Sequence, residues 1–286
     1  MAITINSNIA SLNTQRRLGS ATEALGRTFE RLASGQRINR ASDDAAGLAI
    51  ADKLKADARI ANVAIRNAND GISVIAIADT ALAEIGNVLG RLAELAEQSA
   101  NGVFTTTQRS ALAQEFGALG SEIERIANNT EFNGVKLLSG GASLILQVGL
   151  KGVDVNSQVS FSGVAGTLQS LGLGGANSAL TYSINDSTNG LAQSSAQIAL
   201  DAVKNAITSL TNNRGTLGAT ESRLNVSIAN LQVARENFLS AESRIRDVDV
   251  ASEAAELTRL SILQQAGSSI LAQANQQPSL ALSLLR

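Results

Sequence analysis

The chain has 286 residues, with 23 Lys and Arg against 25 Asp and Glu, and it contains no His and no Cys. Without these two residue types there can be no imidazole general base, no Ser–His or Cys–His nucleophile pair, no disulfide and none of the usual zinc ligands. A net charge of −2 gives no overall basic surface for nucleic acid, and 2% aromatic residues exclude a bulky aromatic core. Hydrophobic residues still reach 44% and there is one Pro, a combination that favours long packed helices.

The N-terminal segment, residues 3–32, has apolar residues at helical spacing with a phase slip near Gly19. The stripe comprises Ile5, Ile9, Leu12, Leu18, Leu25, Phe29 and Leu32. Nothing nearby in the sequence would cover it, so we expect an amphipathic helix that becomes ordered only when it finds a partner. The first ten residues lack the basic and apolar regions of a signal peptide. We therefore expect no cleaved leader. No uninterrupted apolar run reaches the 18 residues that a membrane span requires, so we expect no membrane contact either.

Two long helices with a seven-residue repeat are predicted, one in each half of the chain. Over residues 48–96, steps of four and three from Leu54 reach an apolar residue everywhere except at Asp79 and Gly86. In the second half the repeat is carried by Val203, Leu210, Leu217, Leu224, Leu231, Phe238 and Ile245. A shorter helix is expected at about 106–128. We therefore predict a mainly α fold: a long antiparallel helical rod, or coiled coil, with amphipathic terminal helices.

The middle of the chain, residues 130–190, has a different character. Three short runs are typical of strands: LILQV at 144–148, VSFSG at 159–163 and LTYSI at 180–184. Asn133-Gly134 and Gly140-Gly141 are turn signals. The pattern predicts a small β-hairpin region that caps the rod and is too small for an independent catalytic domain.

The C-terminal segment, residues 253–286, is amphipathic in the same way as the N-terminal one. One predicted face is apolar and holds Leu260, Leu263, Ala266, Ile270 and Ala274, and the opposite face is polar and holds Ser261, Gln265, Ser268, Ala272 and Asn275. Like the N-terminal stripe, the apolar face has no large partner close by in the sequence. Both ends are therefore expected to need partners that lie elsewhere.

No catalytic signature is present. A Gly-Lys dipeptide is missing, which excludes a P-loop, and the Gly-rich stretch at 170–175 is not followed by a helix with an acidic ribose ligand. The acidic pairs Asp43-Asp44 and Asp247/Asp249 do not continue as calcium loops, so we interpret them as helix-capping carboxylates. We expect no enzymatic activity, no cofactor and no bound metal.

Five separated stretches strongly resemble bacterial flagellin. They are SGQRINRASDDAAGLAI at 34–50, RNANDGISVI at 66–75, ELAEQSANG at 94–102, EFNGVKLLS at 131–139 and ILQQAGSSILAQAN at 262–275, followed by a terminal LSLLR. The resemblance covers roughly residues 1–140 and 190–286, and it implies a minimal flagellin without a large variable outer domain. The regions it implies are two halves of an inner core domain (1–47 and 246–286), the helices of a helical domain (48–129 and 191–245) and a hairpin with a short variable region (130–190).

The resemblance implies a structural subunit that polymerises with copies of itself into the extracellular flagellar filament and serves swimming motility. It also implies export through the flagellar secretion channel, a secretion chaperone at the C-terminal helix, and contacts with filament cap and junction proteins. Ile5, Ile9, Leu12, Leu260, Leu263, Ile270 and Ala274 would then form the polymerisation core. Ser261, Gln265, Ser268 and Asn275 would face the central channel. Two alternatives are a hook–filament junction protein, which has flagellin-like ends, and an enzyme inserted in a flagellin frame.

The resemblance further implies contact with the host's Toll-like flagellin receptor. In receptor-activating flagellins an Arg, a Leu and a Glu form the centre of the contact, and the matching positions are Arg91, Leu95 and Glu115. Ala93 and Gly90 stand where a second Arg and a longer polar residue are usual, which would weaken binding. An exposed helix face stabilised by Arg–Glu pairing is the alternative interpretation.

Overall fold

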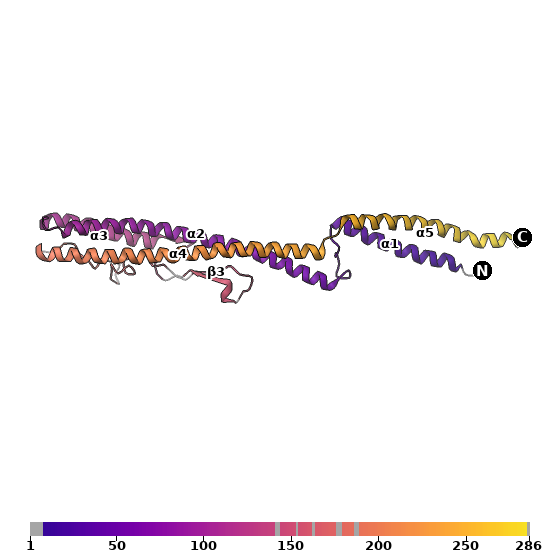
Figure 1. The fold of residues 1–286 in the computed structure, drawn as a ribbon, viewed down its shortest axis with the longest axis horizontal. Helices are drawn as coiled ribbons and strands as arrows, with labels where there is room; N and C mark the ends of the chain where they lie inside the picture. Colours follow the sequence, from indigo (N-terminus) through magenta and orange to yellow (C-terminus); the bar gives the residue numbers. More distant parts are fainter. Residues whose placement is uncertain are drawn as a thin grey trace. The chain divides into compact units, whose positions relative to one another are not determined.

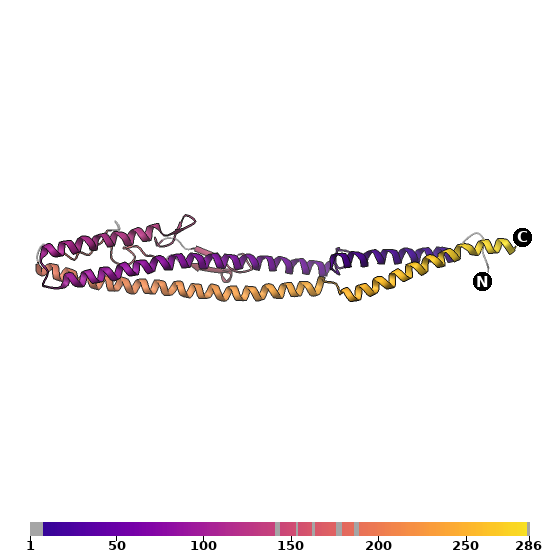
Figure 2. The ribbon, with the colours of Figure 1, turned by 90° about the horizontal axis from the view of Figure 1, so that it is seen from above.

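The computed structural model describes residues 8–140, 144–152, 154–161, 164–175, 179–185 and 189–284. The chain divides into two compact units, one formed by Met1–Ala58 with Glu236–Arg286 and the other by Arg59–Arg235. The described elements are mostly long helices, so the predicted mainly α fold is confirmed (Figures 1 and 2). In chain order they are α1 (Ile9–Ser34), α2 (Ala45–Ala100), α3 (Thr106–Asn129), β1 (Glu131–Phe132), β2 (Val135–Lys136), β3 (Leu144–Gln147), a 3-10 turn (Val155–Ser157), β4 (Gln158–Phe161), α4 (Asn189–Arg246) and α5 (Val250–Leu284).

In the second unit α2 and α4 lie side by side and antiparallel (Figures 1 and 2). Two contacts fix their alignment: Arg214 Nε donates to Asp79 Oδ1 at 2.7 Å, and Arg235 Nη1 donates to Asn62 Oδ1 at 3.2 Å. The seven-residue repeat is buried along most of both helices, as predicted, but Phe238 and Ile245, its last two positions on α4, are only half-buried. On α2 the buried positions are Ala61, Ala68, Ile75, Leu82, Leu89 and Ala96, and on α4 they are Val203, Leu210, Leu217, Leu224 and Leu231.

A second buried row on α2 was not predicted. Ala64, Gly71, Ala78, Ile85, Leu92 and Ser99 also recur every seven residues and are buried. The cause is that α2 is covered on more than one side, by α4 and also by α3, whose Phe116 and Ile123 belong to the same core. A capping box starts α3, where Thr105 and Gln108 satisfy each other's backbone N–H groups. Arg109, in the first turn of α3, is buried and donates from Nη2 to the Asn101 carbonyl oxygen at 3.0 Å.

The apolar character of α2 follows from this packing. An 18-residue window of α2 has a mean hydropathy of 1.6, so by length and composition alone this helix could cross a membrane. Its large apolar side chains at Leu82, Ile85, Leu89 and Leu92 are fully buried in the helix bundle of the second unit. Of the 18-residue window itself 33% is buried, so α2 packs part of its apolar surface against the other helices of the second unit.

The predicted hairpin region is formed by two short antiparallel ribbons. The Asn133-Gly134 turn joins β1 to β2, and both residues have positive φ angles, 50° and 78°, as a two-residue type I′ turn requires. The second ribbon pairs Leu144 with Phe161 and Gln147 with Gln158. It lies along the side of α2, where Asn67 Nδ2 donates to the Gln147 carbonyl oxygen at 3.0 Å. The expectation that this region caps the end of the helices was therefore wrong for β3 and β4. Gly141 and residues 162–163 of the predicted motifs lie outside the described residues.

The predicted strand at 180–184 is not formed. This segment folds as bends that follow a turn, held by hydrogen bonds from Thr181 N to the Leu173 carbonyl at 2.9 Å and from Ser99 Oγ to the Ile184 carbonyl at 2.6 Å. Leu180 instead packs over Gly120 of α3, where an added Cβ would lie 2.2 Å from a Leu180 methyl group. Leu180 also makes one isolated antiparallel β-bridge, to Gly174, so the segment pairs at a single residue and is otherwise attached as a loop to α2 and α3.

In the first unit the linker between α1 and α2 is joined to the linker between α4 and α5. The backbone N–H of Arg37 donates to the Arg246 carbonyl at 2.6 Å, and that of Val248 donates to the Gly35 carbonyl at 3.1 Å. The Arg246 guanidinium adds hydrogen bonds to Gln36 Oε1 at 3.0 Å and to Asp52 Oδ1 at 3.2 Å. We call this set of contacts the linker clasp. It fixes two segments that are about two hundred residues apart in the sequence.

Candidate assembly surfaces

The two terminal helices pair with each other in the first unit. α1 and α5 run antiparallel: Arg31 lies 3.8 Å from Glu253 near the start of α5, and Asn8 Nδ2 donates to the Ala274 carbonyl at 2.7 Å near its other end. Buried and half-buried positions follow steps of three and four along both helices. They are Ser11, Thr14, Leu18, Ala21, Leu25, Thr28 and Leu32 on α1, and Leu257, Leu260, Gln264, Gly267, Leu271 and Ala274 on α5. The seam between α1 and α5 is thus a coiled-coil seam that mixes apolar, polar and small residues.

Local capping fixes the ends of α1. Asn8 is the N-cap residue, and its side-chain oxygen accepts a hydrogen bond from Ser11 N at 3.0 Å while its amide group bonds to α5. Gly35 ends the helix with a φ of 70°, a left-handed conformation that suits glycine. The N-cap side chain therefore both starts α1 and holds it against α5.

The predicted polymerisation residues fall into two groups. Leu260 and Ala274 are buried in the seam against α1. Ile9, Leu12, Leu263 and Ile270 are instead 46–63% exposed. Ile5 lies outside the described residues. The terminal pair consequently leaves large apolar side chains of both helices uncovered.

The predicted channel residues lie on another side of α5. Gln265, Ser268 and Asn275 are exposed and Ser261 is half-buried. Asn275 also accepts a hydrogen bond from Ser11 Oγ at 2.8 Å, a contact that the sequence did not indicate. At about 100° per residue, Leu263 and Ile270 lie roughly opposite Gln265 and Ser268 around the α5 axis. The α1 helix covers the strip between these two faces.

A separate charged cluster lies on α2 and α3 in the second unit. Arg91 Nε donates to Glu115 Oε1 at 2.9 Å, and Arg91 Nη1 donates to Glu94 Oε2 at 2.9 Å. Donation of these hydrogen bonds, to Glu94 first and Glu115 second, raises the pKa of Arg91 above its ordinary value. Glu94 was not predicted, although its position three residues after Arg91 on a helix would have indicated the pair.

Leu95, the third predicted receptor residue, is fully buried in the core beneath this charged cluster. Its side chain cannot be part of the surface in this conformation, because the helices of the second unit cover it. The structure therefore brings Arg91 and Glu115 together at the surface and places Leu95 below them.

Comparison with known proteins identifies the chain. The family model described as the bacterial flagellin N-terminal helical region matches residues 5–143, and the model of the C-terminal helical region matches residues 200–285. This chain belongs to the bacterial flagellin family. It is 43% identical to a flagellin of Halalkalibacterium halodurans and 41% identical to a flagellin of Bacillus subtilis, with 99% of each chain covered in both cases.

This flagellin is a structural, non-enzymatic subunit of the extracellular flagellar filament, which serves motility. Its fold is also shared with a putative flagellar hook-associated protein of Vibrio parahaemolyticus, with a TM-score of 0.55, 15% identity, and coverage of 72% of this chain and 99% of that one. That likeness concerns the fold alone. The full-length identity to flagellins favours the filament subunit over the junction protein.

Proposed function

We propose that this flagellin joins the filament through its terminal pair. Ile9, Leu12, Leu263 and Ile270 would contact neighbouring subunits together with Ile5, and Leu260 and Ala274 would hold α1 and α5 together beneath them. The observation that supports this is the exposure of four large aliphatic side chains on a pair of helices whose own seam is already occupied. Each side chain would gain about 1 kcal/mol if a neighbouring subunit covered the half that water now contacts. Such a contact joins two different surfaces of identical chains. It repeats without closing into a ring and so builds a helical filament.

The polar side of α5 would then line the central channel of the filament. Ser261, Gln265, Ser268 and Asn275 carry hydroxyl and amide groups without charge, and three of the four are exposed. Such groups can stay hydrated along a water-filled channel while the apolar side faces other subunits. Replacing Gln265 and Ser268 with Leu should leave the monomer folded and reduce the yield of filaments that are competent for export.

Seeded growth of filaments from purified monomer tests the apolar contact. Leu263→Ala combined with Ile270→Ala should raise the monomer concentration needed for growth by roughly tenfold, because about 1.4 kcal/mol of contact is lost. Ile262→Ala is the matched control, since Ile262 is 59% exposed on the same helix but lies off the apolar stripe. Equal growth of all three proteins would disprove the proposed contact.

We also propose the export partners that the flagellin family implies: a secretion chaperone that covers α5 before export, and cap and junction proteins at the two ends of the filament. The exposure of Leu263 and Ile270 supports the chaperone, because it would bury these two side chains until the subunits meet. Passage through the flagellar secretion channel, which the family implies, should leave the N-terminus of the secreted protein intact apart from removal of Met1. Mass spectrometry showing the loss of a further 15–30 residues, which is the length of a signal peptide, would contradict this proposal.

Receptor contact is the last proposed interaction. Arg91 and Glu115 would contact the host's Toll-like flagellin receptor, with Leu95 supporting them from the core. Charged side chains paired on a rigid helix face are suited to this role, since Arg is common among residues that dominate binding. A reporter-cell assay should show lower activation by monomeric Arg91→Ala than by Arg125→Ala, which removes a similar exposed Arg–Glu pair on α3. Equal activation by the two variants would show that Arg91 is not part of the receptor contact.

A further inference from the structure

The loop between α2 and α3 holds a reactive pair of residues, Asn101 and Gly102, in a turn that is exposed to water. In an Asn-Gly pair the backbone nitrogen of the glycine can attack the side-chain amide of the asparagine, because glycine has no Cβ to hinder the approach. Asparagine is for this reason among the thermally labile residues. The chain has two further Asn-Gly pairs, at 133–134 and 189–190, and the contacts around each pair decide how readily it reacts.

The turn polarises the side-chain amide of Asn101. The backbone N–H of Val103 donates to Asn101 Oδ1 at 3.1 Å, so the side chain closes a small turn over Gly102. This hydrogen bond holds the amide on the side of the chain where the Gly102 nitrogen has to bond to it. During the attack negative charge develops on Oδ1, and an N–H that already donates to this oxygen stabilises the charge. The turn therefore activates the group that is attacked.

Arg109 of α3 activates the attacking nitrogen. Its Nη2 donates to the Asn101 carbonyl oxygen at 3.0 Å, and the Phe104 N–H donates to the same oxygen at 3.4 Å. The Gly102 nitrogen attacks after it has lost its proton, and the charge of that anion is shared with this carbonyl oxygen through the conjugation of the peptide bond. A guanidinium at the oxygen stabilises the anion. Because Arg109 is only 1% exposed, water screens its charge little.

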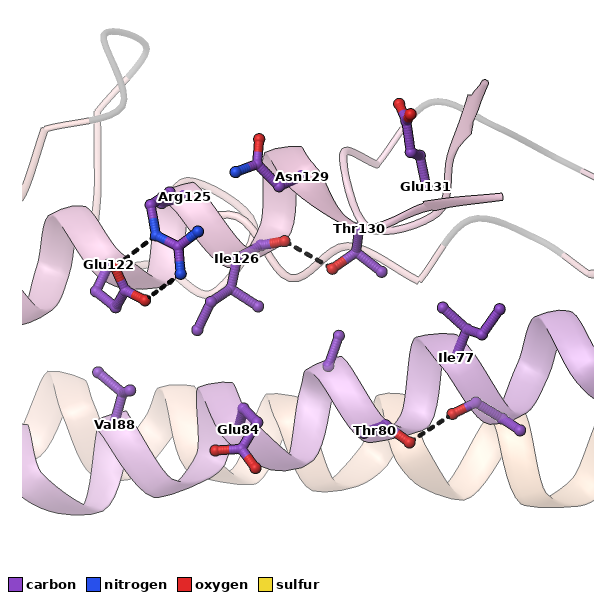
Figure 3. Close-up of a pocket in the computed structure, with 12 residues that line it drawn as sticks. Ile77, Thr80, Glu84, Val88, Glu122, Arg125, Ile126, Asn129, Thr130 and Glu131 are labelled. Atoms are coloured by element: carbon purple, nitrogen blue, oxygen red, sulfur yellow. Dashed lines mark hydrogen bonds and ion pairs between the residues drawn. The ribbon is translucent and has the colours of Figure 1, made fainter. Parts of the chain in front are cut away.

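The Asn133-Gly134 pair has neither kind of activation. It forms the turn of the β1–β2 ribbon, which the two positive φ angles of 50° and 78° fix in one conformation. The base of the ribbon is held as well: Thr130 Oγ1 donates to the Ile126 carbonyl oxygen at 2.7 Å, and the Leu137 N–H donates to the Thr130 carbonyl at 3.0 Å (Figure 3). Among the described residues no side chain donates a hydrogen bond to Asn133. This second pair is therefore a natural comparison within the same chain.

We propose that Asn101 is a site of spontaneous deamidation, which the fold promotes through the Val103 N–H and the Arg109 guanidinium. The Gly102 nitrogen gives its proton to water and bonds to Cγ of Asn101. The bond between Cγ and Nδ2 then breaks, and Nδ2 takes up a proton from water and leaves as ammonia. The product is a cyclic imide that joins residues 101 and 102. The reaction needs one chain and water, so it does not depend on assembly.

Arg109 also selects the final product. Water opens the imide at either of its two carbonyl groups: attack at the former side-chain carbonyl gives aspartate, and attack at the former backbone carbonyl gives isoaspartate. In isoaspartate the main chain passes through Cγ, and the former backbone carbonyl becomes a free carboxylate. Arg109 already donates to the oxygen of that carbonyl, so it polarises this group for attack and pairs with the carboxylate that forms. The folded chain should therefore give an excess of isoaspartate.

Mass spectrometry of the full-length monomer, kept either folded or in urea and then digested with trypsin, tests the proposal. Residues 92–109 form one tryptic peptide in which Asn101 is the single asparagine. In urea Asn101 and Asn133 should react at similar rates, because both precede glycine. In the folded chain Asn101 should react roughly tenfold faster than in urea and Asn133 more slowly. A folded rate for Asn101 that is equal to or below the rate in urea would overturn the proposal.

A substitution of Arg109 tests its two roles together. Arg109→Gln should lower the folded rate at Asn101 toward the rate in urea and remove the excess of isoaspartate. Arg125→Gln is the matched control, since Arg125 is exposed on the same helix and bonds to Glu122, and it should change neither quantity. An unchanged rate and product ratio in folded Arg109→Gln would contradict the role of Arg109. If this variant does not fold, the ratio of folded to urea rates in the original chain still decides the proposal.

Discussion

The α2–α4 pair and the α1–α5 pair share an antiparallel arrangement and a seven-residue repeat, but they bury different residues. The seam of α2 and α4 contains Leu82, Leu89, Leu210 and Leu217, each at most 4% exposed. The seam of α1 and α5 also contains leucines, but at equivalent positions it has Thr28, Gln264 and Gly267, and four further large aliphatic residues of the pair lie exposed outside it. Because a buried leucine contributes about 1.5–3 kcal/mol, the first seam stabilises one chain on its own. The second seam is weak, and copies of the chain are needed to cover its outer face.

The largest effect on monomer stability should come from a substitution in the seam of α2 and α4. Leu89→Ala removes a fully buried side chain and leaves a cavity, so the free energy of unfolding of the monomer should fall by about 3 kcal/mol. Leu263→Ala removes the same atoms from an exposed site and should change it by less than about 0.5 kcal/mol. Urea unfolding of both monomers checks the contrast. Similar losses in the two proteins would mean that the terminal pair is as well packed as the second unit.

The weak seam should be easy to strengthen at Gly267. An added methyl group there would lie 3.3 Å from a Leu18 methyl carbon, which requires a shift of a few tenths of an ångström in a flexible side chain. Alanine is also favoured over glycine within a helix by about 1 kcal/mol. Gly267→Ala should therefore slow hydrogen exchange in α1 and α5 together by a few-fold, with exchange in α3 as the internal control. Faster exchange in the terminal helices would show that Leu18 cannot move aside.

The smallest effect concerns Asp79, the charged residue in the repeat of α2 where it packs against α4. Hydrogen bonds from the Arg214 guanidinium lower the pKa of the Asp79 carboxyl below its ordinary 3.8. Because the folded pKa is the lower one, the pair stabilises the fold above the unfolded pKa, and this contribution is lost as the pH falls through the folded value. Asp79→Asn should cost about 0.5 kcal/mol at neutral pH, since both side chains are partly exposed.

The difference in unfolding free energy between the original protein and Asp79→Asn isolates this pair from other carboxylates. Measured by urea unfolding at several pH values, it should shrink as the pH falls below 3.8, the ordinary pKa of the group. A difference that increases in acid would mean that Asp79 stabilises the fold in its protonated form.

The helices were predictable because their signals are local and repeated. The repeat from Leu54 to Ala96 predicted α2, and the one from Val203 to Ile245 predicted α4, each with its buried face. The Asn133-Gly134 turn was equally clear, since few sequences adopt two successive positive φ angles. In each case the residues within one or two turns contain the information that fixes the structure.

Features that depend on distant parts of the chain were not predictable. The face of α5 that meets α1 includes Gln264 and Gly267, because α1 lies between the apolar and polar faces and not over the apolar one. Leu95 was placed in a receptor contact only because the resemblance to flagellin implied it, yet α2 is covered on more than one side at this point and Leu95 is buried. The run at 180–184 has the alternation of a strand, but the available partner is the surface of α3 at Gly120.

The linker clasp and the terminal pair have a consequence for the order of folding. Arg37 reaches the Ile245 carbonyl across 208 residues of sequence, and Asn8 reaches the Ala274 carbonyl across 266. Contacts that close such long loops form late, after the local contacts of α2 with α3. Synthesis begins at the N-terminus, so α1 has no partner until the last helix is complete. A chain that stops before residue 250 would keep the helices of the second unit but offer an unpaired α1, and filament growth would thereby select full-length subunits.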